Sequence, residues 1–323
     1  MAVMYDRHTI MSSSPLHRTA VALSPEEIRA RVDPDILRGL GSTLADALPD
    51  EPLTAASLRA AARFPESSVA PDAVVSLSRP DDSELELRVH GDTSVDGVLL
   101  WIHGGGLILG SAAAEDGASA QRSAALGVAV VTPDYRLAPE HPYPAAVEDC
   151  LRAVEWAATR FRRVVVAGVS AGGGLAAAVA LRCRDGDGPT ISGLHLYSPM
   201  LDDRGVTPSS SLLSRTVVWN RRLNDFAWSC YLGDIEPDER SVPGRAVDLA
   251  GLAPTYIDVG ELDLFRDEDL EFAQRIAAGG GRIEFHLDRG AVHGFDTRVP
   301  DAPISRAVRA RRLSALATTF EQA

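Results

Sequence analysis

The pattern of apolar and polar positions changes near residue 73. Before it, proline-containing polar stretches alternate with helical patterns. One example is residues 24–27, where a serine, a proline and two acids suit the start of a helix. After it, residues 74–77 and 85–89 alternate in the way typical of antiparallel strands. We therefore expect short helices and no strand before residue 73, and a sheet from there on.

Four later segments are short and almost continuously apolar: residues 97–102, 128–132, 164–168 and 255–260. Runs of this kind mark strands that are buried on both faces, as in parallel sheets. Helical patterns at residues 145–159 and 171–183 occur at the spacing of βαβ crossovers. The sequence therefore predicts an α/β fold with a largely parallel sheet. Residues 200–248 interrupt the alternation, and an irregular insertion of that length predicts a lid or cap.

Composition excludes several classes of protein. The 323 residues are 45% apolar and 24% charged, which is typical of a globular chain. The net charge is −13 and no basic cluster occurs, which argues against a nucleic acid or an anionic membrane as partner. All 32 basic residues are arginine, so mechanisms that need a lysine nucleophile or a phosphate-binding lysine are excluded. No apolar run is long enough to predict a membrane span.

The three cysteines, Cys150, Cys183 and Cys230, are an odd number at wide spacing, which fits neither a disulfide framework nor a zinc site. We expect reduced thiols in a cytoplasmic protein.

A candidate nucleophile stands where an apolar strand meets an alanine-rich helix. Residues 168–172 match G-x-S-x-G, with Ser170 at the centre. A strand–turn–helix setting is the mechanical requirement for a nucleophile elbow, because the flanking glycines permit the tight turn that exposes the serine. The alternative, that Ser170 is only a helix N-cap, is the weaker interpretation in this setting.

A second motif follows the strand at residues 97–102. His103 is followed by Gly104, Gly105 and Gly106, and successive glycines allow backbone N–H groups to converge on one point. Such a point can hold an oxyanion. A flexible glycine loop with a packed histidine is the alternative, but it is less plausible once the motif is paired with the elbow.

A serine nucleophile needs a base and an orienting acid, in the chain order serine, acid, histidine. His293 lies in a loop after a predicted strand, whereas His195 and His286 fall within strands. Asp263 follows the strand at 255–260 and is the first choice for the acid. Three other acids compete with it: Glu261, Asp267 and Glu268.

Together these motifs, with residues 135–140 (YRLAPE) and the His293-Gly294-Phe295 run, resemble the hormone-sensitive-lipase branch of the α/β-hydrolase esterases, over residues 73–320. The resemblance implies a mostly parallel eight-stranded sheet with helices on both faces. It also implies a helical cap made of residues 1–72 and an insertion at 200–248, on a catalytic domain of residues 73–323. Gly105 and Gly106, beside Gly104, would supply oxyanion N–H groups together with Ala171.

The sequence departs from the family pattern at three positions. Val169 stands in the elbow where aspartate or threonine is usual, Leu264 follows the acid where proline is common, and Leu107 follows the glycines where an aromatic residue is frequent. None of these is a reacting group, so the departures bear on the subfamily and on the acyl pocket.

The expected function is hydrolysis of short- to medium-chain carboxylic esters through an acyl-enzyme, without a cofactor or metal. The alternatives are a deacetylase or lactone hydrolase for one specialised metabolite, and a non-catalytic receptor like the plant gibberellin receptors. Leu107, Leu212, Trp219 and Trp228 are candidates for a substrate pocket, although the residues of the insertion fit a small core of the cap equally well. The resemblance also suggests a homodimer formed through the last strand, at residues 283–287.

Overall fold

The sheet of the computed structural model has eight strands. The structure describes residues 21–41, 52–62 and 67–322. The strands in chain order are β1 (Ala73–Ser78), β2 (Glu84–His90), β3 (Gly97–Ile102), β4 (Ala129–Pro133), β5 (Arg163–Val169), β6 (Gly193–Tyr197), β7 (Thr255–Gly260) and β8 (Ile283–Asp288). Their spatial order is β1-β2-β4-β3-β5-β6-β7-β8, and β2 is antiparallel to both of its neighbours while all other pairs are parallel. The predicted mostly parallel sheet of eight strands is therefore confirmed.

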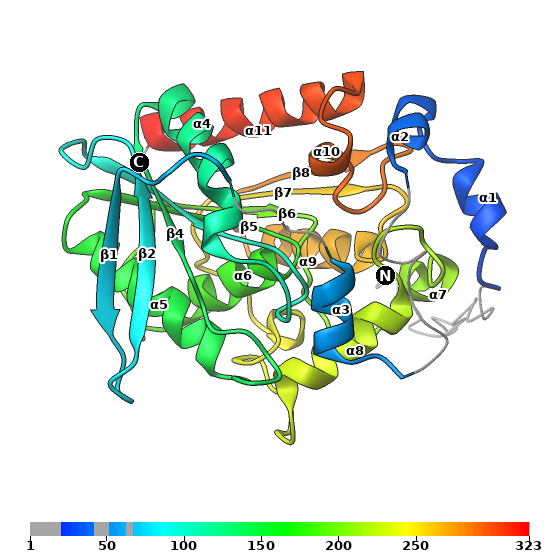
Figure 1. Cartoon of the computed structure of the whole chain (residues 1–323), viewed down its shortest axis with the longest axis horizontal. Coiled ribbons are helices and arrows are strands. Elements are labelled where there is room, and N and C mark those ends of the chain that lie inside the picture. The colour runs from blue at the N-terminus through cyan, green and yellow to red at the C-terminus, as the bar shows by residue number, and fades with distance from the viewer. Residues whose placement is uncertain (1–20, 42–51, 63–66, 323) are drawn as a thin grey trace, which may run out of the picture.

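Helices cover both faces of the sheet (Figure 1). On one face lie α4 (Asp116–Leu126) and α11 (Pro303–Gln322), and on the other α5 (Ala145–Ala158), α6 (Ala171–Arg184) and α9 (Arg266–Ala278). The remaining helices are α1 (Pro25–Arg29), α2 (Pro34–Gly39), α3 (Ala55–Ala61), α7 (Pro208–Leu212), α8 (Arg221–Leu232) and α10 (Phe295–Arg298), with short 3₁₀ turns η1 (Ala112–Glu115) and η2 (Pro243–Arg245).

Side chains of β3 contribute to two hydrophobic cores, one on each face of the sheet. Leu99 and Trp101 face the core beneath α4 and α11, whereas Leu100 and Ile102 face the core beneath α5 and α6. All six residues of β3 are buried, because successive side chains of a strand point to opposite faces and both faces are covered. The continuous apolar runs of the sequence therefore mark the central strands.

The short helices gather beyond the carboxyl ends of the parallel strands (Figure 1). The predicted start of α1 is present: Ser24 and Glu27 form a capping box, and Pro25 is the first helical residue. Ile28 and Ile36 of α1 and α2 share a buried cluster with Val217 and with Val292, next to the candidate base. The N-terminal helices and the 200–248 segment thus pack together around the loops that follow β7 and β8.

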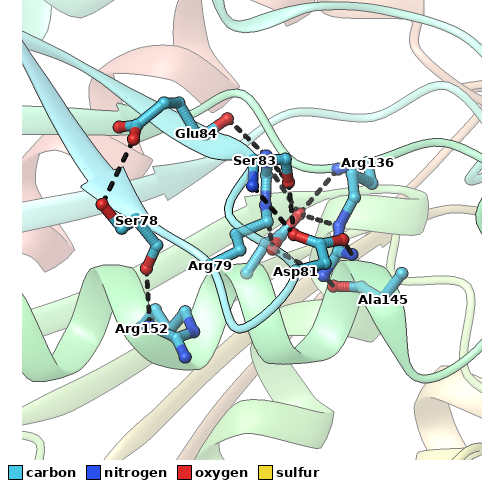
Figure 2. A network of polar contacts seen from close by, with 9 residues as sticks. Ser78, Arg79, Asp81, Ser83, Glu84, Arg136, Ala145 and Arg152 are labelled. Carbon is cyan, nitrogen blue, oxygen red and sulfur yellow. Dashed lines mark hydrogen bonds and ion pairs between the residues drawn. The ribbon is translucent and has the colours of Figure 1, made fainter.

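A buried ion network anchors the loop that follows β4. The carboxylate of Asp149 on α5 has no exposed surface; it accepts hydrogen bonds from Arg79 at 2.8 and 3.1 Å and from the backbone and side chain of Arg136 at 3.0 Å. Figure 2 shows the network around Arg79 and Arg136. Removal of one partner from such a buried group typically costs about 3–5 kcal/mol. The network holds Arg136 in place, and with it the neighbouring Tyr135 that reaches the candidate site.

Candidate active site

Ser170 occupies the sharp turn between β5 and α6. Its backbone has φ 56° and ψ −123°, a strained conformation for a residue with a side chain. The turn depends on close backbone approach: a Cβ atom placed on Gly172 would lie 2.2 Å from the carbonyl oxygen of Ile102. Only glycine fits there, which explains the glycine that follows the serine by two residues. The turn projects Ser170 at the carboxyl end of the sheet, as the motif predicts.

The structure brings His293 and Asp263 to this serine. His293 Nε2 lies 2.9 Å from Ser170 Oγ, and His293 Nδ1 lies 2.7 Å from Asp263 Oδ2. Asp263 is fully buried, and its other oxygen accepts the backbone N–H of Phe265 at 3.1 Å. The Phe265 ring meets the imidazole edge-on, with 5.2 Å between ring centroids. The imidazole is therefore held from two sides, with a nitrogen directed at the serine.

The competing acids point elsewhere. Glu261, Asp267 and Glu268 each accept a backbone N–H from another part of the chain, at 2.8, 2.6 and 2.9 Å respectively. Burial raises the pKa of the Glu268 carboxyl well above its usual range. Of the four acids, Asp263 is the one whose carboxylate is bonded to His293.

The glycine loop runs beside the nucleophile. A Cβ atom placed on Gly104 would lie 3.3 Å from the Ser170 Cβ. Gly105 and Gly106 have φ values of 122° and 61°, a backbone region that favours glycine. Within the described part of the chain, no oxygen accepts a hydrogen bond from the backbone N–H of Gly105, Gly106 or Ala171. These donors are free to bind a negatively charged oxygen near Ser170.

Leu107 continues the left-handed path of this loop with φ 66°, which is strained for a branched side chain and costs about 1–3 kcal/mol. Its carbonyl oxygen accepts the backbone N–H of Ala138 at 3.0 Å. The loop is thus held by contacts outside itself.

A small pocket opens next to Ala171. It lies between α6 and the 200–248 segment and is mostly apolar; its lining includes Leu107, Leu175, Met200, Trp228 and Tyr231. Of the predicted pocket residues, Leu107 and Trp228 line it, whereas Trp219 and Leu212 do not. Trp219 packs on the backbone of Gly106, where a Cβ atom would lie 2.2 Å from its ring. Leu212 packs against the cluster that contains the N-terminal helices.

The part of the chain that is described contains no group of three His, Cys, Asp or Glu side chains placed to hold a metal ion. The search of the same residues for a helix with the length and apolarity of a membrane span finds none.

Comparison with known proteins shows the family to which the chain belongs. A model of the family described as the alpha/beta hydrolase fold matches residues 99–297. Esterase LipI of Mycobacterium tuberculosis is 38% identical over 61% of this chain and 65% of its own length, so the match spans just under two thirds of that relative. Carboxylesterase NlhH of the same species is 31% identical over 68% of this chain and 72% of its own. The crystal structure of esterase LipW from Mycobacterium marinum superimposes with a TM-score of 0.81 at 32% identity, covering 92% and 98% of the two chains.

The fold and the elbow thus define an α/β hydrolase. Within that family the chain belongs to the group of hormone-sensitive-lipase-like esterases, as the motifs of the sequence indicate.

Proposed function

We propose that the protein is a serine carboxylesterase that cleaves short- to medium-chain carboxylic esters through an acyl-enzyme. The observation that carries this proposal is the continuous hydrogen-bond chain from Ser170 Oγ through His293 to Asp263, at 2.9 and 2.7 Å. A serine whose hydroxyl is bonded to an oriented imidazole is the arrangement that acyl transfer requires. The esterase names of the relatives support the same reaction.

In the proposed mechanism, Ser170 Oγ attacks the ester carbonyl and His293 Nε2 takes its proton. The resulting oxyanion accepts hydrogen bonds from the backbone N–H groups of Gly105, Gly106 and Ala171. His293 then protonates the leaving alcohol, and a water molecule activated by the same imidazole releases the acid. Asp263 fixes the tautomer with a proton on Nδ1 and stabilises the imidazolium. No step needs a cofactor.

Replacement of the nucleophile tests this mechanism. Ser170→Ala should lower turnover of a p-nitrophenyl short-chain ester by a factor on the order of a million. An organophosphonate probe should add its mass to the peptide that contains Ser170. The matched control is Ser94→Ala, in the exposed turn between β2 and β3, which should keep wild-type rates. Retained activity in Ser170→Ala, or a label on another peptide, would contradict the assignment.

The pocket beside Ala171 supports the substrate class. Its apolar lining suits the acyl chain, and its small size favours a short chain. We expect a series of esters from C2 to C12 to show highest kcat/KM at the short end. A preference for long, emulsified esters would instead indicate a lipase.

Two alternatives differ from this proposal in substrate preference or in turnover. A dedicated deacetylase or lactone hydrolase would share the triad and differ only in leaving-group preference, so a panel of alcohols and lactones distinguishes it. A receptor on this fold would bind an ester without turning it over, and the presence of the base His293 bonded to Ser170 favours an enzyme.

The helical cap is part of the proposal. Residues 1–72, so far as they are described, and the insertion at 200–248 would cover the catalytic domain of residues 73–323. The support is that α1 and α2 share a buried cluster with the insertion and with Val292, next to His293. Trp228 of the insertion lines the pocket beside Ala171.

A homodimer through β8 is also proposed. This strand is the last of the sheet, and it pairs with β7 on one side. Leu287 on it is 49% exposed, so that a second copy could cover it. Light scattering after size exclusion tests this proposal, with Leu287→Arg as the variant expected to shift the mass to that of a monomer. We also infer a cytoplasmic location, which the free, buried thiols of Cys150 and Cys183 support.

A further inference from the structure

Arg59 is a residue of the N-terminal segment that reaches the glycine loop. It lies on α3, and its Nε donates to the carbonyl oxygen of Ile108 at 2.9 Å. Its Nη2 donates to the carbonyl oxygen of Ala138 at 3.0 Å, and both terminal nitrogens bind Glu140 at 2.7 and 2.8 Å. One guanidinium group therefore joins α3 to two segments that lie 49 residues and 79 to 81 residues further along the chain.

The segment that Arg59 holds is the continuation of the candidate oxyanion loop. Gly105, Gly106 and Leu107 all have φ in the left-handed region, so the local sequence gives this path little preference of its own. The turn carries internal hydrogen bonds from Ile108 and Leu109 to the Gly105 carbonyl. The carbonyl oxygens of Leu107 and Ile108 accept hydrogen bonds from outside the turn. Their donors are the backbone N–H of Ala138 and the side chain of Arg59, respectively. External contacts therefore fix where the loop lies.

The carbonyl contacts matter more than the ion pair. The side chains of Arg59 and Glu140 are 35% and 54% exposed, and exposed ion pairs contribute little to stability. The guanidinium nevertheless lowers the pKa of Glu140 to about 2, so the partner is charged at any pH at which the enzyme would be assayed. Hydrogen bonds from a charged guanidinium to the two carbonyl oxygens are stronger than neutral ones. The guanidinium therefore holds the loop through its bonds to the two carbonyl oxygens, and its exposed ion pair with Glu140 adds little to this hold.

We propose that Arg59 is a positioning residue for ester hydrolysis: by binding the Ile108 and Ala138 carbonyl oxygens, it keeps the N–H groups of Gly105 and Gly106 aimed at the oxyanion. This inference rests on the proposed function. It gives α3 a part in turnover, in addition to covering the site. A loop displaced by a fraction of an ångström binds the ester almost as well but stabilises the transition state less.

The test compares Arg59→Met with Glu140→Gln. Methionine keeps an apolar stem but has no donor, so kcat for p-nitrophenyl butyrate should fall about 10- to 100-fold, with KM changed less than threefold. Glu140→Gln keeps an acceptor for the guanidinium, so kcat should stay within threefold of wild type. Guanidinium chloride, at concentrations far below those that unfold proteins, should restore part of the activity of Arg59→Met and leave Glu140→Gln unaffected.

A transition-state analogue shows whether the variant loses oxyanion stabilisation in particular or has a generally looser structure. An alkyl trifluoromethyl ketone forms a hemiketal oxyanion with Ser170, and its Ki should rise in Arg59→Met by the same factor by which kcat/KM falls. If methionine prevents folding, Arg59→Lys gives the same test, because one ammonium group cannot occupy the sites of both Nε and Nη2. Wild-type kcat and Ki in a folded Arg59 variant would overturn the inference. Failure of the proposed function looks different, because wild-type protein would then resist the phosphonate probe.

Discussion

The phenol ring of Tyr135 stacks on the imidazole of His103, with ring centroids 4.2 Å apart, and its hydroxyl donates to the His103 carbonyl oxygen at 2.9 Å. His103 directly precedes the glycine loop, so this contact fixes the point where the loop leaves β3. The YRLAPE run of residues 135–140 thus connects the buried Asp149 network to the candidate site through Arg136 and Tyr135.

Tyr135→Phe should destabilise the protein and slow turnover. The variant keeps the ring stack but leaves the buried His103 carbonyl without its donor, which costs about 1–3 kcal/mol. For a domain of this size that is a fall in Tm of roughly 2–4 °C for each kcal/mol. Differential scanning calorimetry measures it.

Tyr197 provides the matched control. Its hydroxyl is buried and has no hydrogen-bond partner among the described residues. Tyr197→Phe therefore removes an unsatisfied group, and its Tm should equal or exceed that of the wild type. Equal losses of Tm in the two variants would mean that the Tyr135 hydroxyl contributes no more than any buried phenol.

Asp263→Asn should lower kcat by about 10³- to 10⁴-fold while the protein stays folded, because an amide no longer selects the tautomer of His293 that accepts a proton from Ser170. Asp267→Asn is the control, since Asp267 binds Arg266 and the backbone of Ser209 instead. Steady-state rates on a p-nitrophenyl ester decide between them. If Asp267→Asn were the slower variant, the acid would be misassigned.

Much of the fold and of the candidate site follows from local patterns. The apolar runs of β3, β5 and β7 predict buried strands. The loops that follow parallel strands meet at one edge of the sheet. The structure accordingly brings Ser170, Asp263 and His293 together from three separate motifs. Their chemistry lies in short, recognisable segments.

The pocket and the hydrogen bonds of Arg59 to the glycine loop depend instead on residues that are far apart in the sequence. Trp219 and Trp228 both belong to the 200–248 segment, and only the path of that segment decides that Trp228 lines the pocket while Trp219 covers Gly106. Arg59 resembles any exposed arginine on a short helix in the sequence. Its role requires two carbonyl oxygens that lie 49 and 79 residues away in the sequence. No local pattern predicts these contacts.

Trp228→Phe should shift acyl preference toward longer chains. The smaller ring enlarges the pocket beside Ala171, and space for one methylene group is worth about 1–3 kcal/mol of discrimination in an apolar pocket. The kcat/KM ratio for hexanoyl over acetyl p-nitrophenyl esters should therefore rise at least several-fold.

Trp156→Phe is a closely matched control for this change. Both tryptophans are buried, and neither indole N–H has a partner within the described residues. Trp156 lies on α5 and lines a groove beside β1 instead of the pocket. The ester ratio of this variant should equal that of the wild type. A shift of the ratio in both variants would indicate that loosened packing, rather than pocket size, sets the preference.

Asp269→Asn should stabilise the protein, and more so at higher pH. Asp269 on α9 is fully buried, and neither of its carboxylate oxygens has a hydrogen-bond partner in the described part of the chain. Burial raises the pKa of this carboxyl well above its usual range, and the nearby carboxylates of Glu268 and Asp263 raise it further. The folded state therefore holds its proton at pH values where the unfolded chain has released it.

The sign of the pH effect follows from this difference. Below about pH 4, the pKa of an aspartate in an unfolded chain, both states are protonated and Asp269 costs nothing through ionisation. As pH rises above 4, the unfolded state gains stability by ionising, and the wild type loses stability until the folded carboxyl also ionises. Asparagine has no such loss, so the gain in Tm of Asp269→Asn should be larger at pH 8 than at pH 5. Glu271→Gln, on the exposed side of the same helix, is the matched control. A gain that is equal at both pH values, or a loss at pH 8, would show that the Asp269 carboxylate has a stabilising partner in solution.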